Sequence, residues 1–296
     1  MSLKRACPRD LVLGAICLIL SIWHGNDHAL AVERVSFESA RYLVGPLQLR
    51  LARERGEAIE RPPVDTIEGF LKKPDGNGSF PTVVLLHGCG GIPADMRSGA
   101  RRHFWFDQLV AWGYAALGVD SFTTRGVTEA CTGRQLPLSR VADAYGALAF
   151  LSRQPFVDTN RIAVMGFSQG ATAALSAVEH QDFDLFEGQA DWKFKTAIAF
   201  YPYCLHDGNF AVPTLILIGE LDDWAPASAC RTMIAKRKAT ESPVTLIVYP
   251  GAHHAFDVPY LQPGARVFGH WQEYNSIAAS NATQEVRHFL RRLSGT

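Results

Sequence analysis

The sequence has no net charge, few cysteines and no apolar run long enough to cross a membrane. Its 29 Lys and Arg residues balance 29 Asp and Glu residues. A neutral chain lacks the long-range attraction for phosphate backbones that a dedicated nucleic-acid-binding protein uses. Six cysteines among 296 residues are too few for a disulfide scaffold. These absences, together with 47% apolar residues, favour an ordinary globular protein with no nucleic-acid partner.

The N-terminus has the pattern of a secretory signal peptide. Lys4, Arg5 and Arg9 precede an apolar run at residues 11–23, which is too short for the roughly 20 residues of a membrane-spanning helix. Residues 29–31 then read Ala-Leu-Ala, a small-residue cleavage pattern. We therefore expect residues 1–31 to be removed and the protein to be periplasmic or secreted, with no membrane attachment afterwards.

Residues 32–296 alternate between short apolar runs and helical patterns. The runs that predict strands lie at residues 82–86, 114–119, 161–165, 196–200, 214–218 and 244–249. The patterns that predict helices lie at residues 106–112, 141–151, 171–178, 227–237 and 283–293. This alternation predicts a single α/β domain, with a mostly parallel central sheet and helices on both faces. We expect residues 35–39 and 66–71 to add antiparallel strands at one edge, and residues 45–63 to form a surface excursion.

A serine follows one of the predicted strands. Residues 166–170 read Gly-Phe-Ser-Gln-Gly, directly after the run at 161–165 and before a predicted helix. A nucleophilic serine on a sharp strand-to-helix turn needs small neighbours, because the turn brings backbone segments close together. The context therefore makes Ser168 a candidate nucleophile, although the five-residue pattern alone is weak.

An acid and a base follow two later strands. Asp222 and Asp223 come after the run at 214–218, and His253 and His254 come after the run at 244–249. The chain order serine, aspartate, histidine is that of the α/β-hydrolase fold. In parallel sheets, the carboxyl ends of the strands carry the chemistry, so these positions predict a catalytic triad. The spacing leaves open which aspartate and which histidine take part.

The glycine-rich segment after residues 82–86 predicts an oxyanion hole. Residues 87–91 read His-Gly-Cys-Gly-Gly, and the backbone N–H groups of Cys89 and Gln169 are the expected donors. A dinucleotide-binding loop is excluded, because Pro93 stands where the last glycine should be. No metal-binding motif is present, and we expect neither a metal nor a cofactor. A thiol at Cys89 is more often packed or disulfide-bonded than nucleophilic.

From about residue 64 to the end, the chain resembles the dienelactone hydrolase family, particularly its exported, serine-containing members. The motifs that carry the resemblance are HGCGG at 87–91, DSF at 120–122, RG at 125–126, DxxRI at 158–162, GFSQG at 166–170, GExD at 219–222 with Pro226, and YPGAxHAF at 249–256. The resemblance implies the α/β-hydrolase fold and a triad of Ser168, Asp222 and His254. The namesake enzymes have a cysteine nucleophile where this chain has Ser168, and the implied reaction here is ester hydrolysis.

Three further residues are candidates for substrate binding. Arg125 lies in the polar loop 121–137, and its planar guanidinium would suit a substrate carboxylate. Tyr201 and Trp224 follow two of the strands and are candidates to line the acyl or alcohol pocket, with core packing as the equal alternative.

Four cysteines remain after the predicted cleavage, and an even number in an exported chain favours one or two disulfides. Four cysteines allow three full pairings. Cys204 follows one strand and Cys230 lies on the helix after the next, so we expect these two to be joined.

The sequence as a whole predicts a serine hydrolase that cleaves small carboxylic esters or lactones through a Ser168-His254-Asp222 triad and an acyl-enzyme. One alternative is a small serine peptidase on the same fold, although residues 32–63 are short for the cap that peptides would need. Another is a catalytically silent protein that binds a small ligand. The oligomeric state cannot be predicted from the sequence.

Overall fold

The computed structural model describes most of the chain after the predicted signal peptide. The described residues are 32–59, 64–93, 104–132, 138–180, 186, 193–205, 207–238 and 242–294. Residues 1–31 lie outside these ranges, so the signal peptide stays a prediction. Within the described ranges, no helix combines the length and apolar character that a membrane crossing requires.

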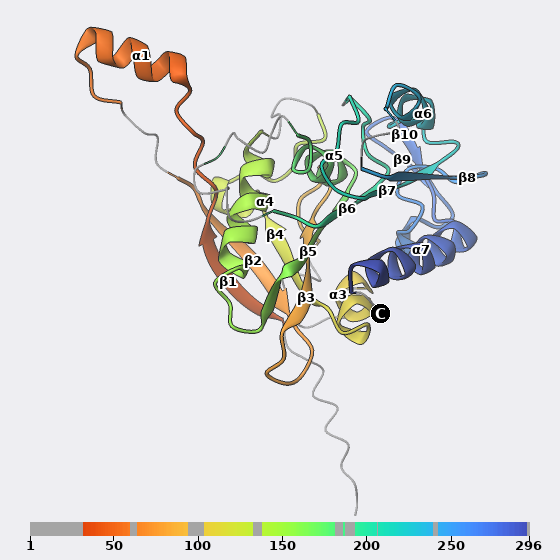
Figure 1. The fold of residues 1–296 in the computed structure, drawn as a ribbon. Helices are drawn as coiled ribbons and strands as arrows, with labels where there is room; N and C mark the ends of the chain where they lie inside the picture. The colour runs from red at the N-terminus through yellow and green to blue at the C-terminus, as the bar shows by residue number, and fades with distance from the viewer. Residues whose placement is uncertain are drawn as a thin grey trace, which may run out of the picture.

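An eight-stranded sheet forms the centre of the molecule (Figure 1). From one edge to the other, its strands are β1 (Glu33–Glu38), β2 (Thr66–Lys72), β4 (Ala115–Asp120), β3 (Phe80–Leu86), β5 (Val157–Phe167), β6 (Thr196–Phe200), β7 (Thr214–Gly219) and β8 (Val244–Tyr249). Neighbours from β4 to β8 run parallel, whereas β2 is antiparallel to both β1 and β4. The predicted parallel sheet and its antiparallel edge are confirmed.

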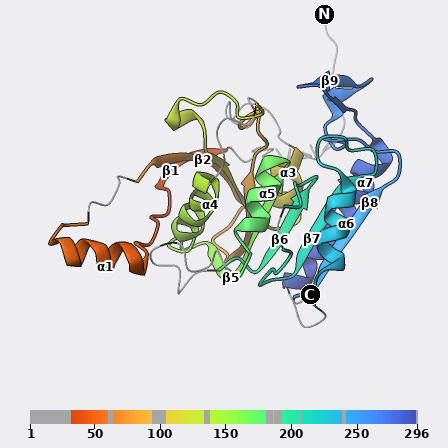
Figure 2. The same cartoon turned by 90° about the horizontal axis from the view of Figure 1, so that it is seen from above.

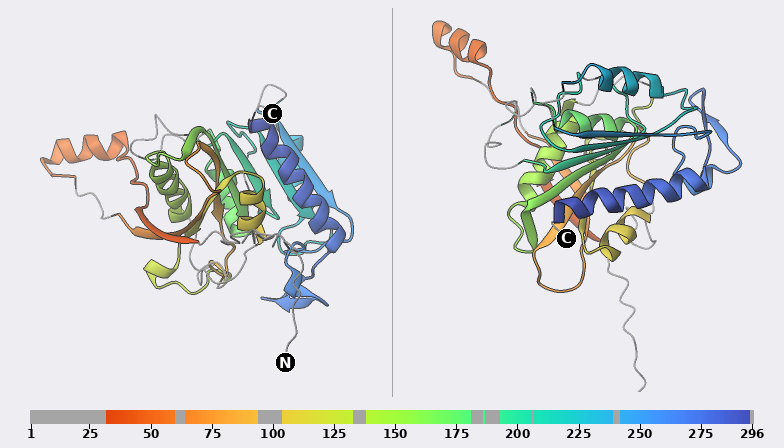
Figure 3. Two further views of the ribbon diagram at one scale, coloured as in Figure 1. Left: turned by 90° about the horizontal axis from the view of Figure 1, so that it is seen from below. Right: turned by 45° about the vertical axis from the view of Figure 1, so that its right-hand side comes forward.

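The helices cover both faces of the sheet, as predicted. α4 (Leu138–Leu151), α5 (Gln169–Ser176) and α6 (Ala227–Ala235) lie on one face, which Figure 2 turns toward the viewer. α3 (Phe104–Ala111) and α7 (Ser276–Ser294) lie on the other face (Figure 3). This covering explains why every residue of β4, β6 and β7 is buried. Apolar runs without alternation are the sequence signature of such doubly covered strands.

Some elements differ from the sequence prediction. The predicted surface excursion contains α1 (Pro46–Arg55), a helix that stands away from the sheet in Figure 1. A hairpin of β9 (Ala265–Val267) and β10 (His270–Gln272) was not predicted, because strands of three residues are too short to show alternation. Short 3₁₀ turns, η1 (Thr123–Arg125) and η3 (Pro259–Leu261), complete the described elements.

Two disulfides join segments at the carboxyl edge of the sheet. Cys204 is bonded to Cys230, which confirms the predicted pair. The second disulfide joins Cys89 to Cys131 and accounts for the thiol in the glycine-rich segment. Cys89 is therefore not a free nucleophile in this structure.

Candidate active site

Ser168 occupies the turn between β5 and α5 with an unusual backbone conformation. Its φ is 53° and its ψ is −119°, a region that residues with a side chain rarely adopt. The backbone N–H of Ser168 donates to the Phe200 carbonyl at 2.9 Å, which ties the turn to β6. A Cβ on Gly166 would overlap the backbone of Gly170, so the turn closes only with glycine at that position. Such a turn is the strained elbow that presents a nucleophile above the sheet.

Gly170 must also be a glycine, because it packs directly against the backbone that follows β3. A Cβ at this position would overlap the carbonyl oxygens of Leu86 and His87 at the end of β3. We expect Gly170→Ala to lower the free energy of unfolding by about 1–3 kcal/mol, because backbone atoms cannot move aside as a flexible side chain can. Thermal and urea unfolding measure the change. Gly90→Ala is the control, since a Cβ at Gly90 meets nothing within 4 Å, and equal stability of the two variants would contradict the packing argument.

Ser168, His254 and Asp222 form one hydrogen-bonded chain. His254 Nε2 lies 3.0 Å from Ser168 Oγ, and His254 Nδ1 lies 2.8 Å from Asp222 Oδ2. All three side chains are buried. With a carboxylate as its partner, Nδ1 carries the proton, and Nε2 is left as the acceptor for the serine hydroxyl. The imidazole is therefore oriented to take a proton from Ser168.

The second oxygen of Asp222 holds the carboxylate in place. Oδ1 accepts the backbone N–H groups of Trp224 at 3.0 Å and Ala225 at 2.7 Å. Asp223 and His253, the alternatives that the sequence left open, make other contacts. His253 is turned toward the Leu221 carbonyl, and Asp223 accepts the backbone N–H of Trp271. The structure thus brings Asp222 and His254 to Ser168 but does not bring Asp223 or His253.

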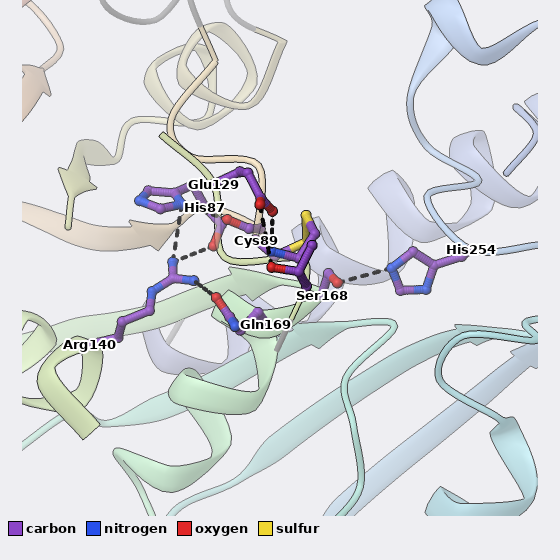
Figure 4. Close-up of a disulfide and its surroundings, with 10 residues drawn as sticks. His87, Cys89, Glu129, Arg140, Ser168, Gln169 and His254 are labelled. Atoms are coloured by element: carbon purple, nitrogen blue, oxygen red, sulfur yellow. Dashed lines mark hydrogen bonds between the residues drawn. A yellow bond between two sulfur atoms is a disulfide. The ribbon is translucent and has the colours of Figure 1, made fainter. Parts of the chain in front are cut away.

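The segment after β3 lies directly beside Ser168 (Figure 4). A Cβ on Gly88 would be 3.7 Å from the Cβ of Ser168. Cys89 is held by its disulfide, and its carbonyl accepts the Ala130 N–H at 2.8 Å. Gln169 is the first residue of α5. The two expected oxyanion donors therefore belong to segments that meet at Ser168.

The structure pairs Arg125, a candidate for substrate binding, with two carboxylates. Its Nη1 and Nη2 donate to the two carboxylate oxygens of Asp143 at 2.7 and 2.8 Å, and its Nε donates to Asp65 at 2.7 Å. Burial alone would lower the pKa of Arg125, but the hydrogen bonds and charges of Asp143 and Asp65 outweigh it and raise the pKa. These carboxylates already occupy the guanidinium, which joins α4 to the segment before β2.

Tyr201 and Trp224 lie against the imidazole of His254, with ring centroids 4.6 and 5.1 Å from it. The Tyr201 hydroxyl donates to Asp257 at 2.8 Å, and burial raises the pKa of both Tyr201 and Asp257. Trp224 stacks on His270 of β10 at 4.8 Å. Tyr201 therefore packs against His254 and is hydrogen-bonded to Asp257. Trp224 packs against His254 on one side and against His270 of the β9–β10 hairpin on the other.

Sequence reasoning missed two charged residues inside the structure: Asp257, which is partly buried, and Arg140, which is fully buried. Asp257 directly follows the motif at 249–256 that contains His254, and this position was the available signal. Arg140 lies on α4, directly before the predicted helical pattern at 141–151. An arginine on a helix usually faces solvent, and nothing in the sequence distinguishes this one. Among the described residues, no group of three or more His, Cys, Asp or Glu side chains could hold a metal ion.

The mostly parallel sheet, its two helical layers and the serine on the elbow after β5 define an α/β-hydrolase. The model of the dienelactone hydrolase family matches residues 67–294, and the chain belongs to this family. The resemblance inferred from the sequence motifs is confirmed.

Curated relatives share about a fifth of their residues with this chain. A putative carboxymethylenebutenolidase of Methylorubrum extorquens is 23% identical over 66% of this chain and 69% of its own length. A probable 2-oxo-3-(5-oxofuran-2-ylidene)propanoate lactonase of Bradyrhizobium is 21% identical, with 75% and 88% covered.

Solved structures share the fold. A putative dienelactone hydrolase from Klebsiella pneumoniae has a TM-score of 0.60 at 17% identity, covering 88% of this chain and 99% of its own. An esterase from Thermogutta terrifontis has a TM-score of 0.57 at 17% identity, covering 77% and 89%.

Proposed function

We propose that this protein is an exported serine hydrolase that cleaves small carboxylic esters or lactones through an acyl-enzyme on Ser168. The hydrogen-bonded chain from Ser168 through His254 to Asp222 carries the proposal. A silent ligand-binding protein would have no use for this alignment of hydroxyl, base and carboxylate at the ends of three strands. The reaction needs no cofactor.

The proposed reaction begins when Ser168 Oγ attacks the carbonyl carbon of the substrate. His254 Nε2 takes the hydroxyl proton, and Asp222 stabilises the imidazolium that forms. The backbone N–H groups of Cys89 and Gln169 donate to the oxyanion, each contributing about 3–4 kcal/mol of transition-state stabilisation. His254 then returns the proton to the leaving oxygen. A water molecule, activated by the same imidazole, cleaves the acyl-enzyme.

The names of similar proteins support the ester or lactone class of substrate. One curated relative is named a lactonase, and one neighbour in fold is named an esterase. Export is supported by the basic and apolar pattern of residues 1–31 and by two disulfides. Disulfides persist in oxidising compartments and are rare in the cytosol.

Covalent labelling tests the proposal directly. A fluorophosphonate probe reacts with a serine only when a neighbouring base activates it. Mass spectrometry of the digested protein should find the adduct on the peptide that contains Ser168. Ser176→Ala, at the other end of the same helix, should label as the wild type does, and His254→Ala should label far more slowly.

Failure of a folded wild-type protein to form the adduct would contradict an activated serine. Paired substrates separate the two enzyme classes: p-nitrophenyl esters should be hydrolysed, and the matching anilides should not. Cleavage of the anilides at a comparable rate would favour the peptidase instead.

A further inference from the structure

Among the described residues, Arg140 is the largest side chain with less than 2% of its surface exposed, and the proposed reaction does not use it. It lies on α4, and only 1% of its surface is exposed. Burial lowers its pKa to about 10, an effect that the charge of Asp143 opposes. Asp143 itself forms its hydrogen bonds with Arg125 and Ser39. A buried cation without its own hydrogen-bonded carboxylate is costly, and it needs an explanation other than stability.

The hydrogen bonds of Arg140 point to that explanation. Nη1 donates to the side-chain carbonyl of Gln169 at 3.1 Å, and Nη2 donates to the backbone carbonyl of His87. Gln169 supplies one expected oxyanion donor, and His87 lies two residues before the other, Cys89. Figure 4 shows the guanidinium on one side and both partners reaching toward it. One rigid fork therefore links the two segments whose N–H groups must converge on the same oxygen.

The His87 carbonyl is also fixed from its other side. It lies so close to Gly170 that no Cβ fits between them. The His87 ring belongs to the same arrangement, because Nε2 accepts the backbone N–H of Ser121 at 3.3 Å. His87 Nδ1 also lies 2.7 Å from the Gly88 carbonyl oxygen and 3.3 Å from Arg140 Nη2. The segment that carries Cys89 thus has little freedom to move as long as Arg140 holds the His87 carbonyl.

We propose that Arg140 is a positioning residue for the oxyanion hole, holding the Cys89 segment and the Gln169 elbow at the spacing that the tetrahedral intermediate requires. The inference rests on the proposed function of Ser168. The fork sets the distance between the two segments, because its Nη atoms are fixed relative to each other. Its charge is buried, and the low dielectric of a buried site strengthens its effect on a developing oxyanion.

This role predicts a particular kinetic signature. The oxyanion exists in the transition state and not in the bound ester, so loosening its donors should lower kcat and leave KM nearly unchanged. We expect Arg140→Met to lower kcat about 100-fold, as for other small misplacements of catalytic groups. KM should stay within about threefold of the wild type. Arg140→Lys should recover part of the loss, because an ammonium can reach one of the two carbonyls.

The measurement separates positioning from folding. The fluorophosphonate adduct on Ser168, taken to completion, counts the folded sites in each preparation, and kcat is expressed per labelled site. Affinity for a trifluoromethyl ketone, which forms a tetrahedral oxyanion adduct on the serine, should fall in parallel with kcat. Arg237→Met is the matched control. Arg237 also joins two backbone carbonyls, those of Gly208 and Ser242, but these belong to the loops that precede β7 and β8.

A second variant keeps the test valid if Arg140→Met folds poorly. Gln169→Ala removes one acceptor while keeping the backbone N–H, and it should lower kcat in the same direction with Arg140 intact. In the double variant, the combined loss should be smaller than the product of the single losses. The proposal is overturned if kcat per labelled site is unchanged in Arg140→Met, if KM rises while kcat stays constant, or if Arg237→Met gives the same loss. Absence of labelling in the wild type would instead overturn the proposed function.

Discussion

Ser168→Ala is expected to lower kcat for ester hydrolysis by roughly a millionfold, the loss seen when a serine hydrolase is deprived of its nucleophile. Alanine removes only Oγ, and the backbone of the elbow is held by the Phe200 carbonyl and by the packing of Gly166 and Gly170. The loss should therefore arise without unfolding. Hydrolysis of p-nitrophenyl acetate or butyrate, followed by absorbance, measures the rate.

The fold of the Ser168→Ala variant should be tested by circular dichroism and thermal unfolding. We expect its free energy of unfolding to stay within about 1 kcal/mol of the wild type, because the substitution removes one buried hydrogen bond to His254. Ser176→Ala should retain full activity. A Ser168→Ala protein that is folded and still hydrolyses esters at the wild-type rate would remove Ser168 from the reaction.

Asp222→Asn is expected to lower kcat by about 10⁴-fold, the loss known for this substitution in serine proteases. The asparagine carbonyl can still accept the N–H groups of Trp224 and Ala225, so the loop should keep its shape. The amide NH₂ then faces His254 Nδ1, where the carboxylate oxygen stood at 2.8 Å. Two donors cannot share one hydrogen bond, so the imidazole must move its proton to Nε2. In that tautomer, Nε2 can no longer accept the proton of Ser168.

Asp223→Asn provides the comparison for this variant. Asp223 is the adjacent carboxylate, is exposed, and contacts the hairpin through the Trp271 N–H rather than through His254. Its replacement should leave kcat within about threefold of the wild type. Stopped-flow or steady-state hydrolysis over a range of pH gives both values. Equal losses in the two variants would show that general loop damage, and not the imidazole tautomer, controls the rate.

The strands could be predicted from sequence because both faces of the sheet are covered. Residues 215–218 and 197–200 are apolar without interruption, and the structure buries every one of them. The site residues that follow these strands could be predicted because the carboxyl ends of parallel strands lie at one edge of the sheet. The hydrogen bonds of Asp222 and His254 then distinguish them from Asp223 and His253, which the spacing alone could not do.

Long-range pairing of charged groups limited the prediction. Arg125 looked like a substrate-binding residue because Asp143, its partner, lies 18 residues away and Asp65 lies 60 away. Arg140 gave no signal, since its contacts with His87 and Gln169 span 53 and 29 residues. The Cys89–Cys131 disulfide crosses 42 residues, and the sequence left open whether this remaining pair is joined. A periodic pattern reports local burial, but it does not report which distant side chain fills a given contact.

The tight contact between Gly170 and the His87 carbonyl limits which residues can be replaced as the sequence evolves. Gly166 and Gly170 are demanded by the packing of α5 against β3 and β5, whether or not a reaction takes place. A descendant that lost the serine hydroxyl would still lose stability if either glycine were replaced. The glycines of the pentapeptide therefore report the fold of the chain and not its activity.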